Sequence, residues 1–277
     1  MNQRFRNILS CFIPFLVYIG VMLVVMFCFA AYASAVKTSS AEEMEQFVNE
    51  HLLLMTTIID AVLIPVFYLM WRLDRDKYPL KRADMPDFSW MILALIGASV
   101  CVGLNYFLNM FMPKEILNTY EQTSEVLWNE DTRLLSFISV VLVAPLTEEL
   151  MFRGLIYTRL RLMLKAPYTI LATAVLFGLF HENLLQFMYA FVIGLILAYI
   201  METYRSLWAP IMVHAAANII SWLLTYVVMI PSDDGGALDY SVLGGTLLIT
   251  ATGIYSIVYI RKIKKNKANQ MKSEEEK

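Results

Sequence analysis

Charged side chains are scarce in this chain. Lys, Arg, Asp and Glu make up 17% of its 277 residues and apolar residues make up 58%, with a mean hydropathy of +0.58. Soluble domains carry roughly a quarter charged residues and slightly under half apolar residues. This composition excludes an ordinary soluble domain and indicates a protein whose solvent is largely the bilayer.

Cysteine is also rare, and its spacing excludes two classes of site. The three cysteines, Cys11, Cys28 and Cys101, all lie in apolar stretches and form no CxxC pair. A disulfide framework or a cysteine zinc cluster needs paired or closely spaced cysteines. We therefore interpret all three as small apolar packing residues.

Long apolar runs dominate the remaining sequence. A helix needs about 20 such residues to cross the hydrocarbon core. The runs predict spans at 8–35, 52–71, 89–112, 134–157, 168–182, 184–203, 207–230 and 241–260. The predicted fold class is an all-α, polytopic transmembrane helical bundle of about eight spans.

The first run has a second interpretation. Arg4 and Arg6 precede it, and Ala33-Ser34-Ala35 is typical of a signal-peptidase site. However, the run from Ile8 to Ala31 is longer than the ~7–15 apolar residues of a signal peptide. We expect a retained helix, with cleavage as the alternative.

The basic residues are distributed unequally between the predicted loops. Eighteen Lys and Arg residues fall in segments on one side and three on the other. Because basic loops stay in the cytoplasm, we predict a multi-pass cell-membrane protein with both termini cytoplasmic. The charged tail, residues 262–277, is interpreted as a solvated topology anchor rather than a binding arm, and no nucleic-acid partner is expected.

Ionisable residues inside spans are costly and are functional candidates by default. They are Asp60, Glu148, Glu149, Arg153, His181 and His214. Asp60 has no evident partner, so we expect it to serve helix pairing. His51, at an outer boundary, is interpreted as an interfacial residue.

Helical spacing separates the roles of the two glutamates. Glu149 and Arg153 are four residues apart with the acid first, the favourable order for a helical ion pair. Glu148 points about 100° away from Glu149. One carboxylate is therefore predicted to be neutralised while the other is left for chemistry.

The remaining candidates follow the same spacing. His214 and Asn218 share one helix face, and Phe177 lies one turn from His181. Each group alone is compatible with helix packing. Together, at similar estimated depths in the bilayer, they predict a hydrolytic site that contains a base for water and donors or ligands for an oxyanion or metal.

Three motifs carry a resemblance to a known family. Residues 148–153 fit EExxxR, 177–181 fit FxxxH and 214–218 fit HxxxN. In this order the chain resembles the CPBP family, the CAAX-protease and bacteriocin-processing membrane proteases also called Abi. The resemblance covers about residues 134–230, flanked by unmatched helices in 1–133 and a final helix and basic tail in 231–277.

The resemblance implies an intramembrane endopeptidase, a metalloprotease by class, that acts on membrane-associated or C-terminally processed protein or peptide substrates. It implies that Glu148 is the base, assisted by His181, with Glu149 paired to Arg153. His181, His214 and Asn218 would bind a divalent metal, zinc, or His214 and Asn218 would donate to an oxyanion in a metal-free glutamate mechanism. The chain has no HExxH motif. A non-catalytic scaffold for bacteriocin self-immunity, or a proton-coupled transporter, is the alternative.

Overall fold

The computed structural model describes residues 3–36, 40–75, 89–117, 130–181 and 183–226, which form helices and turns without any strand. The helices are α1 (Gln3–Val36), α2 (Ala41–Arg75), α3 (Ser89–Phe111), η1 (Glu130–Thr132), α5 (Arg133–Phe137), η2 (Ile138–Val143), α6 (Ala144–Glu149), η3 (Leu150–Tyr157), α7 (Thr158–Arg161), α8 (Ala166–Leu179), α9 (Leu184–Tyr204) and α10 (Trp208–Tyr226). The predicted all-α membrane bundle is confirmed.

Length and composition divide these helices into two groups. Four are long and apolar enough to cross a membrane: α1 (over Ile8–Ala35), α2, the continuous helix Arg133–Arg161, and α9. Three shorter apolar helices lie within α3, α8 and α10. Each predicted span between residues 8 and 230 thus coincides with a helix. The eighth predicted span, 241–260, and the basic tail lie outside the described residues.

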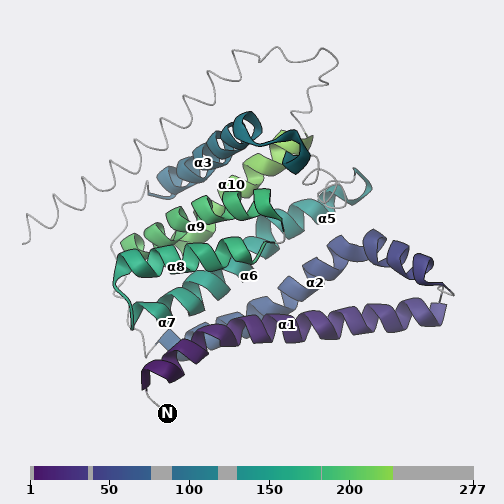
Figure 1. Ribbon diagram of the computed structural model, residues 1–277, viewed down its shortest axis with the longest axis horizontal. Coiled ribbons are helices and arrows are strands. Elements are labelled where there is room, and N and C mark those ends of the chain that lie inside the picture. Colours follow the sequence, from purple (N-terminus) through teal and green to yellow (C-terminus); the bar gives the residue numbers. More distant parts are fainter. Residues whose placement is uncertain (1–2, 37–39, 76–88, 118–129, 182, 227–277) are drawn as a thin grey trace, which may run out of the picture.

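The continuous helix Arg133–Arg161, which comprises α5, η2, α6, η3 and α7, occupies the middle of the described bundle. It contacts α1 and α2 along one side and α8, α9 and α10 along the other. α1 and α2 pack together, and α3 packs against α10 on the opposite side of the molecule (Figure 1). The two predicted catalytic glutamates therefore lie on a helix that has neighbouring helices on both sides.

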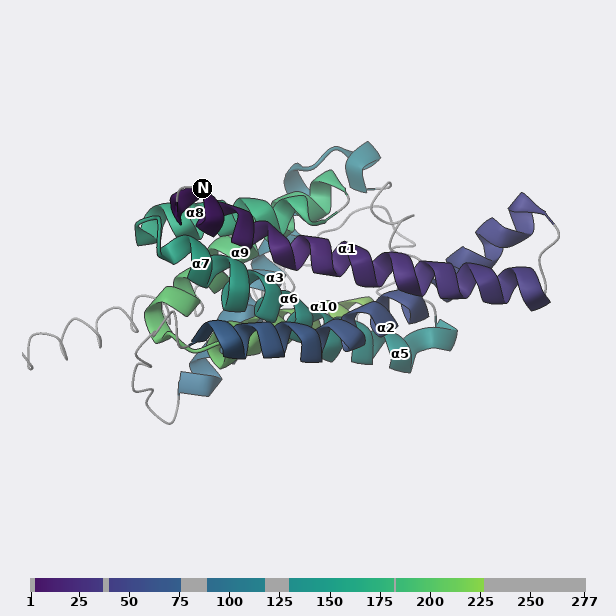
Figure 2. The same ribbon diagram turned by 90° about the horizontal axis from the view of Figure 1, so that it is seen from below.

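Ion pairs join several helix ends at one end of the bundle. Arg159 of α7 pairs with Asp74 at the end of α2, with Nη2 and Oδ2 2.6 Å apart, and donates to the Ser10 carbonyl of α1. Arg161 donates to both carboxylate oxygens of Glu202 near the end of α9. The view turned by 90° shows these ends of α1, α2, α7 and α9 on the same side of the molecule (Figure 2).

Candidate active site

Glu148 and Glu149 end a short α-helix between two π-helical stretches. η2 and η3 have the wider π-helical hydrogen bonding, and α6 lies between them. Pro145 lies in the first turn of α6, and its missing N–H interrupts the regular hydrogen-bond ladder there. π-Helical segments inside longer helices occur frequently at functional sites.

Glu149 is neutralised by an arginine on its own helix. Nη1 of Arg153 lies 2.8 Å from Oε1 of Glu149, and neither side chain is exposed to solvent. Nη2 of Arg153 donates to the Gly194 carbonyl of α9, and its guanidinium lies 4.4 Å from the centre of the Phe177 ring. The predicted Glu149–Arg153 ion pair is confirmed.

The same Glu149 oxygen also holds His214 of α10. Nδ1 of His214 lies 2.9 Å from Oε1 of Glu149. Because an ionised carboxylate can only accept a hydrogen bond, Nδ1 carries the proton. In the neutral imidazole, Nε2 then keeps its lone pair. This contact crosses two helices, and no spacing in the sequence predicted it.

Glu148 differs from Glu149 in its surroundings. Its Oε2 lies 3.8 Å from Nε2 of His214, longer than a hydrogen bond. This oxygen is buried and has no hydrogen-bond partner among the described residues. Its side chain keeps 17% of its surface exposed, whereas that of Glu149 has none. Glu148 is thus the glutamate that remains open to a further ligand.

A third carboxyl group reaches this site from α2. Asp60 is buried, and the Thr147 hydroxyl, one residue before Glu148, donates to its backbone carbonyl at 3.0 Å. Because Thr147 directly precedes Glu148, this bond brings the Asp60 backbone next to the part of α6 that carries Glu148. This bond joins α2 to α6 through the backbone, so the helix-pairing role expected of the Asp60 side chain stays a prediction. Its position beside Glu148 was missed, because α2 lies far from α6 in the sequence.

His181 and Asn218 lie around this group without joining its hydrogen bonds. Nδ1 of His181 bonds to the Phe177 carbonyl, one turn earlier. The Phe177 ring contacts both imidazoles edge-on, at 5.1 Å from His181 and 5.8 Å from His214. Nδ2 of Asn218 donates to the Val140 carbonyl of η2 at 2.7 Å. The roles predicted for both residues stay predictions.

A catalytic zinc site usually has three protein ligands close together. Within the described parts of the chain, no three His, Cys, Asp or Glu side chains are grouped to hold a metal ion. Nδ2 of Asn218 donates to the Val140 carbonyl, and a metal would bind the Oδ1 of this side chain. The donors therefore do not form a metal-binding cluster here, so zinc ligation by His181, His214 and Asn218 stays a prediction and no step is derived through it.

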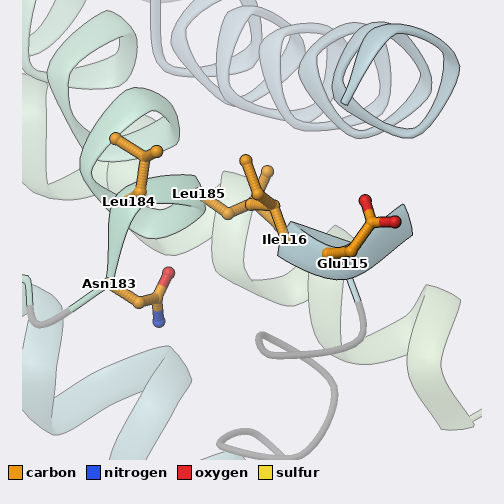
Figure 3. A pocket seen from close by; sticks show the side chains of 5 residues that line it. All are labelled: Glu115, Ile116, Asn183, Leu184 and Leu185. Atoms are coloured by element: carbon orange, nitrogen blue, oxygen red, sulfur yellow. The ribbon is translucent and has the colours of Figure 1, made fainter. Parts of the chain in front are cut away.

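A pocket of about 220 Å³ lies at the start of α9, and neither Glu148 nor Glu149 lines it. Glu115 and Ile116 line one wall, and Asn183, Leu184 and Leu185 line the other (Figure 3). Asn183 is committed to the α9 N-terminus, because its side chain accepts from the Gln186 N–H. None of the predicted site residues lines this pocket.

A protein-family model matches the part of the chain that carries these residues. Residues 130–220 match the model described as Rce1-like, type II CAAX prenyl endopeptidase Rce1-like. This segment is similar to that family, and we refer to it as the Rce1-like segment. It covers less than half of the chain, and it contains Glu148, Glu149, Arg153, His181, His214 and Asn218.

The other comparisons added no relatives: no curated protein and no solved structure matches the chain. The Rce1-like match and the apolar helices together support an integral membrane protein of the CAAX protease type. α1, α2 and α3 lie outside the Rce1-like segment, although α2 supplies Asp60.

Proposed function

We propose that this protein is an intramembrane endopeptidase for membrane-associated substrates that end in a CAAX sequence, with Glu148 as the base that activates water. The Rce1-like match supports the protease class, the bilayer setting and a peptide substrate. One observation supports the assignment of Glu148. Glu148 keeps 17% of its side chain exposed and has no arginine partner among the described residues, and its Oε2 lies 3.8 Å from His214 Nε2. Glu149, in contrast, is fully buried with Oε1 bound to both Arg153 and His214.

In this proposal the Glu148 carboxylate accepts a proton from water as the water oxygen attacks the scissile carbonyl carbon. The carbonyl double bond opens to a tetrahedral oxyanion. Glu148 then passes the proton to the amide nitrogen as the C–N bond breaks, which leaves a carboxylate and an amine. Such general acid–base catalysis contributes about 10²–10⁴ in rate.

Glu149 acts in this scheme through His214. The Nδ1–H···Oε1 bond fixes the ring orientation and keeps Nε2 directed at the space beside Glu148. A carboxylate that holds one imidazole nitrogen also sets the tautomer of that ring. We assign to Asn218, and to His214 when its Nε2 carries a proton, the role of donors to the oxyanion. We assign to His181 the role of assisting Glu148.

The test compares two conservative substitutions in the purified full-length protein. The substrate is a fluorogenic peptide that ends in a farnesylated CAAX sequence. Glu148→Gln should lose at least a hundredfold in kcat, because an amide cannot accept the proton. Glu45→Gln, at an exposed position of α2, should match the parent. Full activity in both Glu148→Gln and Glu148→Ala would refute the role and favour the scaffold interpretation.

Metal removal separates the two proposed chemistries. If His181 and His214 bind zinc, the purified protein should contain close to one equivalent (the one-site expectation), and either His→Ala should remove it. If the histidines act without metal, protein from which a chelator has removed all metal should still cleave the same peptide. Loss of activity in Glu148→Gln is expected in both cases.

A further inference from the structure

The N-terminal helix α1 packs against the turn that carries His181, although α1 lies outside the Rce1-like segment. The rings of Tyr18 and Phe180 meet edge to face with their centres 4.9 Å apart. Phe180 directly precedes His181 and caps the C-terminus of α8. A residue of the unmatched N-terminal region therefore contacts the immediate neighbour of a predicted site residue.

A second ring of α1 strengthens this contact. Phe15 lies 5.8 Å from Phe152 and 6.4 Å from Phe180, measured between ring centres. Phe152 in turn packs edge to face on both Phe180 and Phe177. Edge-to-face contacts of this kind favour defined ring orientations. The rings of Phe177 and Phe180 both contact the His181 imidazole, so α1 is connected to His181 by continuous aromatic packing.

The position of His181 makes it dependent on this packing. α8 ends at Leu179, so His181 lies in the turn beyond the helix. Its described polar contact is the bond from Nδ1 to the Phe177 carbonyl. This single hydrogen bond fixes the position of Nδ1 but not the plane of the imidazole ring, so it does not by itself set the direction of Nε2. The neighbouring Phe rings therefore determine where Nε2 is directed.

The two faces of α1 differ sharply. Phe15 and Tyr18 are partly buried against the aromatic core. Leu16, Leu23 and Phe27 on the other side are 66%, 58% and 74% exposed, as expected for a face that meets lipid. Substitutions on the exposed face thus provide matched controls on the same helix.

We propose that Phe15 and Tyr18 are positioning residues of the active site, which hold Phe180 and thereby orient His181. α1 is then part of the catalytic unit and not only a membrane span. The effect on turnover rests on the proposed protease function. The effect on the His181 ring does not.

The experiment uses two readouts on the purified full-length chain. Tyr18→Ala removes the ring, Tyr18→Phe keeps it, and Phe27→Ala removes an exposed ring from the same helix. Kinetics are measured with the farnesylated CAAX peptide. The ring signals of His181 are followed by NMR with labelled histidine. The chain has only three histidines, so single substitutions assign them.

In Tyr18→Ala we expect kcat to fall on the order of tenfold or more, because small displacements of a positioned group are costly in rate. KM should change little, and the His181 ring signal should shift. Tyr18→Phe and Phe27→Ala should resemble the parent in both readouts. If Tyr18→Ala fails to accumulate, Tyr18→Leu keeps the apolar volume without the ring and should show the same kcat loss and shift.

Parental kcat and an unchanged His181 signal in the ring-deleted variant, with Glu148→Gln inactive, would overturn this inference and leave the protease function intact. An active Glu148→Gln would refute the protease mechanism, while the NMR shift would still decide the role of α1. If the protein is cleaved after the predicted signal-peptidase site and cleaves the peptide at the parental rate without α1, the proposal is also overturned.

Discussion

Two adjacent glutamates of this protein have opposite environments. Glu149 has Arg153 and His214 on one oxygen and no exposed surface. Glu148 keeps 17% of its side chain exposed and pairs with no arginine among the described residues, although each glutamate has an Oε2 without a hydrogen bond there. A buried carboxylate with a buried cation is held in place by the cost of separating them. A carboxylate that lacks such a partner is available to react.

This difference predicts opposite consequences for stability. Arg153→Ala should lower the free energy of unfolding by about 3–5 kcal/mol, because it leaves Glu149 as an uncompensated buried charge. Glu148→Gln is nearly isosteric and breaks no described hydrogen bond, so it should unfold at nearly the parental temperature. Thermal unfolding in detergent, together with protein level in the membrane, measures both. Equal losses in the two variants would contradict the separate roles.

Two contacts between helices determine how the site is assembled. The first lies between α3 and α10, where a Cβ on Gly97 would lie 2.1 Å from the Val213 carbonyl oxygen. Only glycine permits this approach, and Val213 directly precedes His214. α3 therefore helps to set the position of the imidazole from outside the Rce1-like segment.

Gly97→Ala should force α3 and α10 apart and displace His214. We expect a loss of about 3 kcal/mol in stability, at the upper end for overpacking, together with loss of peptide cleavage. Gly20→Ala is the matched control, because a Cβ there meets nothing within 4 Å. It should be neutral or gain up to about 1 kcal/mol from the better helix propensity of alanine. Parental stability and activity in Gly97→Ala would show that the helices can separate without harm.

The second contact is the pair of Arg159 and Asp74, which joins α7 to α2 and, through the Ser10 carbonyl, to α1. Both side chains are largely buried, at 7% and 12% exposure. Arg159→Ala should therefore destabilise the protein by about 3 kcal/mol.

Arg161→Ala provides the comparison for that pair. Its salt bridge to Glu202 is 30% and 21% exposed, and more exposed pairs contribute about 1 kcal/mol or less. Thermal unfolding of both variants tests the ranking. Glu202 also accepts a hydrogen bond from the Tyr157 hydroxyl. A larger loss in Arg161→Ala would mean that the contacts of Glu202, and not the Arg159 pair, hold this end together.

At the scale of the molecule, several of the described basic residues gather at one end of the bundle. Arg72 and Arg75 end α2, Arg159 and Arg161 lie in α7, and Arg205 follows α9. The ion pairs of Arg159 and Arg161 bring these helix ends together. This arrangement agrees with the side that the sequence predicts to be cytoplasmic.

The topology is testable with cysteines introduced near residues 40–45 and 262–277. An impermeant thiol reagent added to intact cells should label the first group and spare the second, because both termini are predicted to be cytoplasmic. Permeabilised cells, in which both groups should react, provide the control. Labelling of the tail from outside would refute the topology.

The sequence by itself determined the helical membrane fold and the local pairs. An apolar run of about 20 residues in the bilayer forms a helix, because a helix pairs its own backbone N–H and C=O groups without water. Glu149–Arg153 and Phe177–His181 followed from one-turn spacing, because such neighbours on a helix must lie close together. The sequence also indicated the candidate site residues, because an ionisable side chain within a span costs several kcal/mol.

Only the tertiary structure decided which of these groups touch. His214 bonds to Glu149, Asp60 lies beside Glu148, Gly97 admits the α10 backbone, and Tyr18 packs on Phe180. Each contact joins helices far apart in the sequence, and helical periodicity gives the face of a residue but not the helix that this face meets. The physical reason is that the packing of several helices together selects the neighbours, and this depends on side chains along every interface at once.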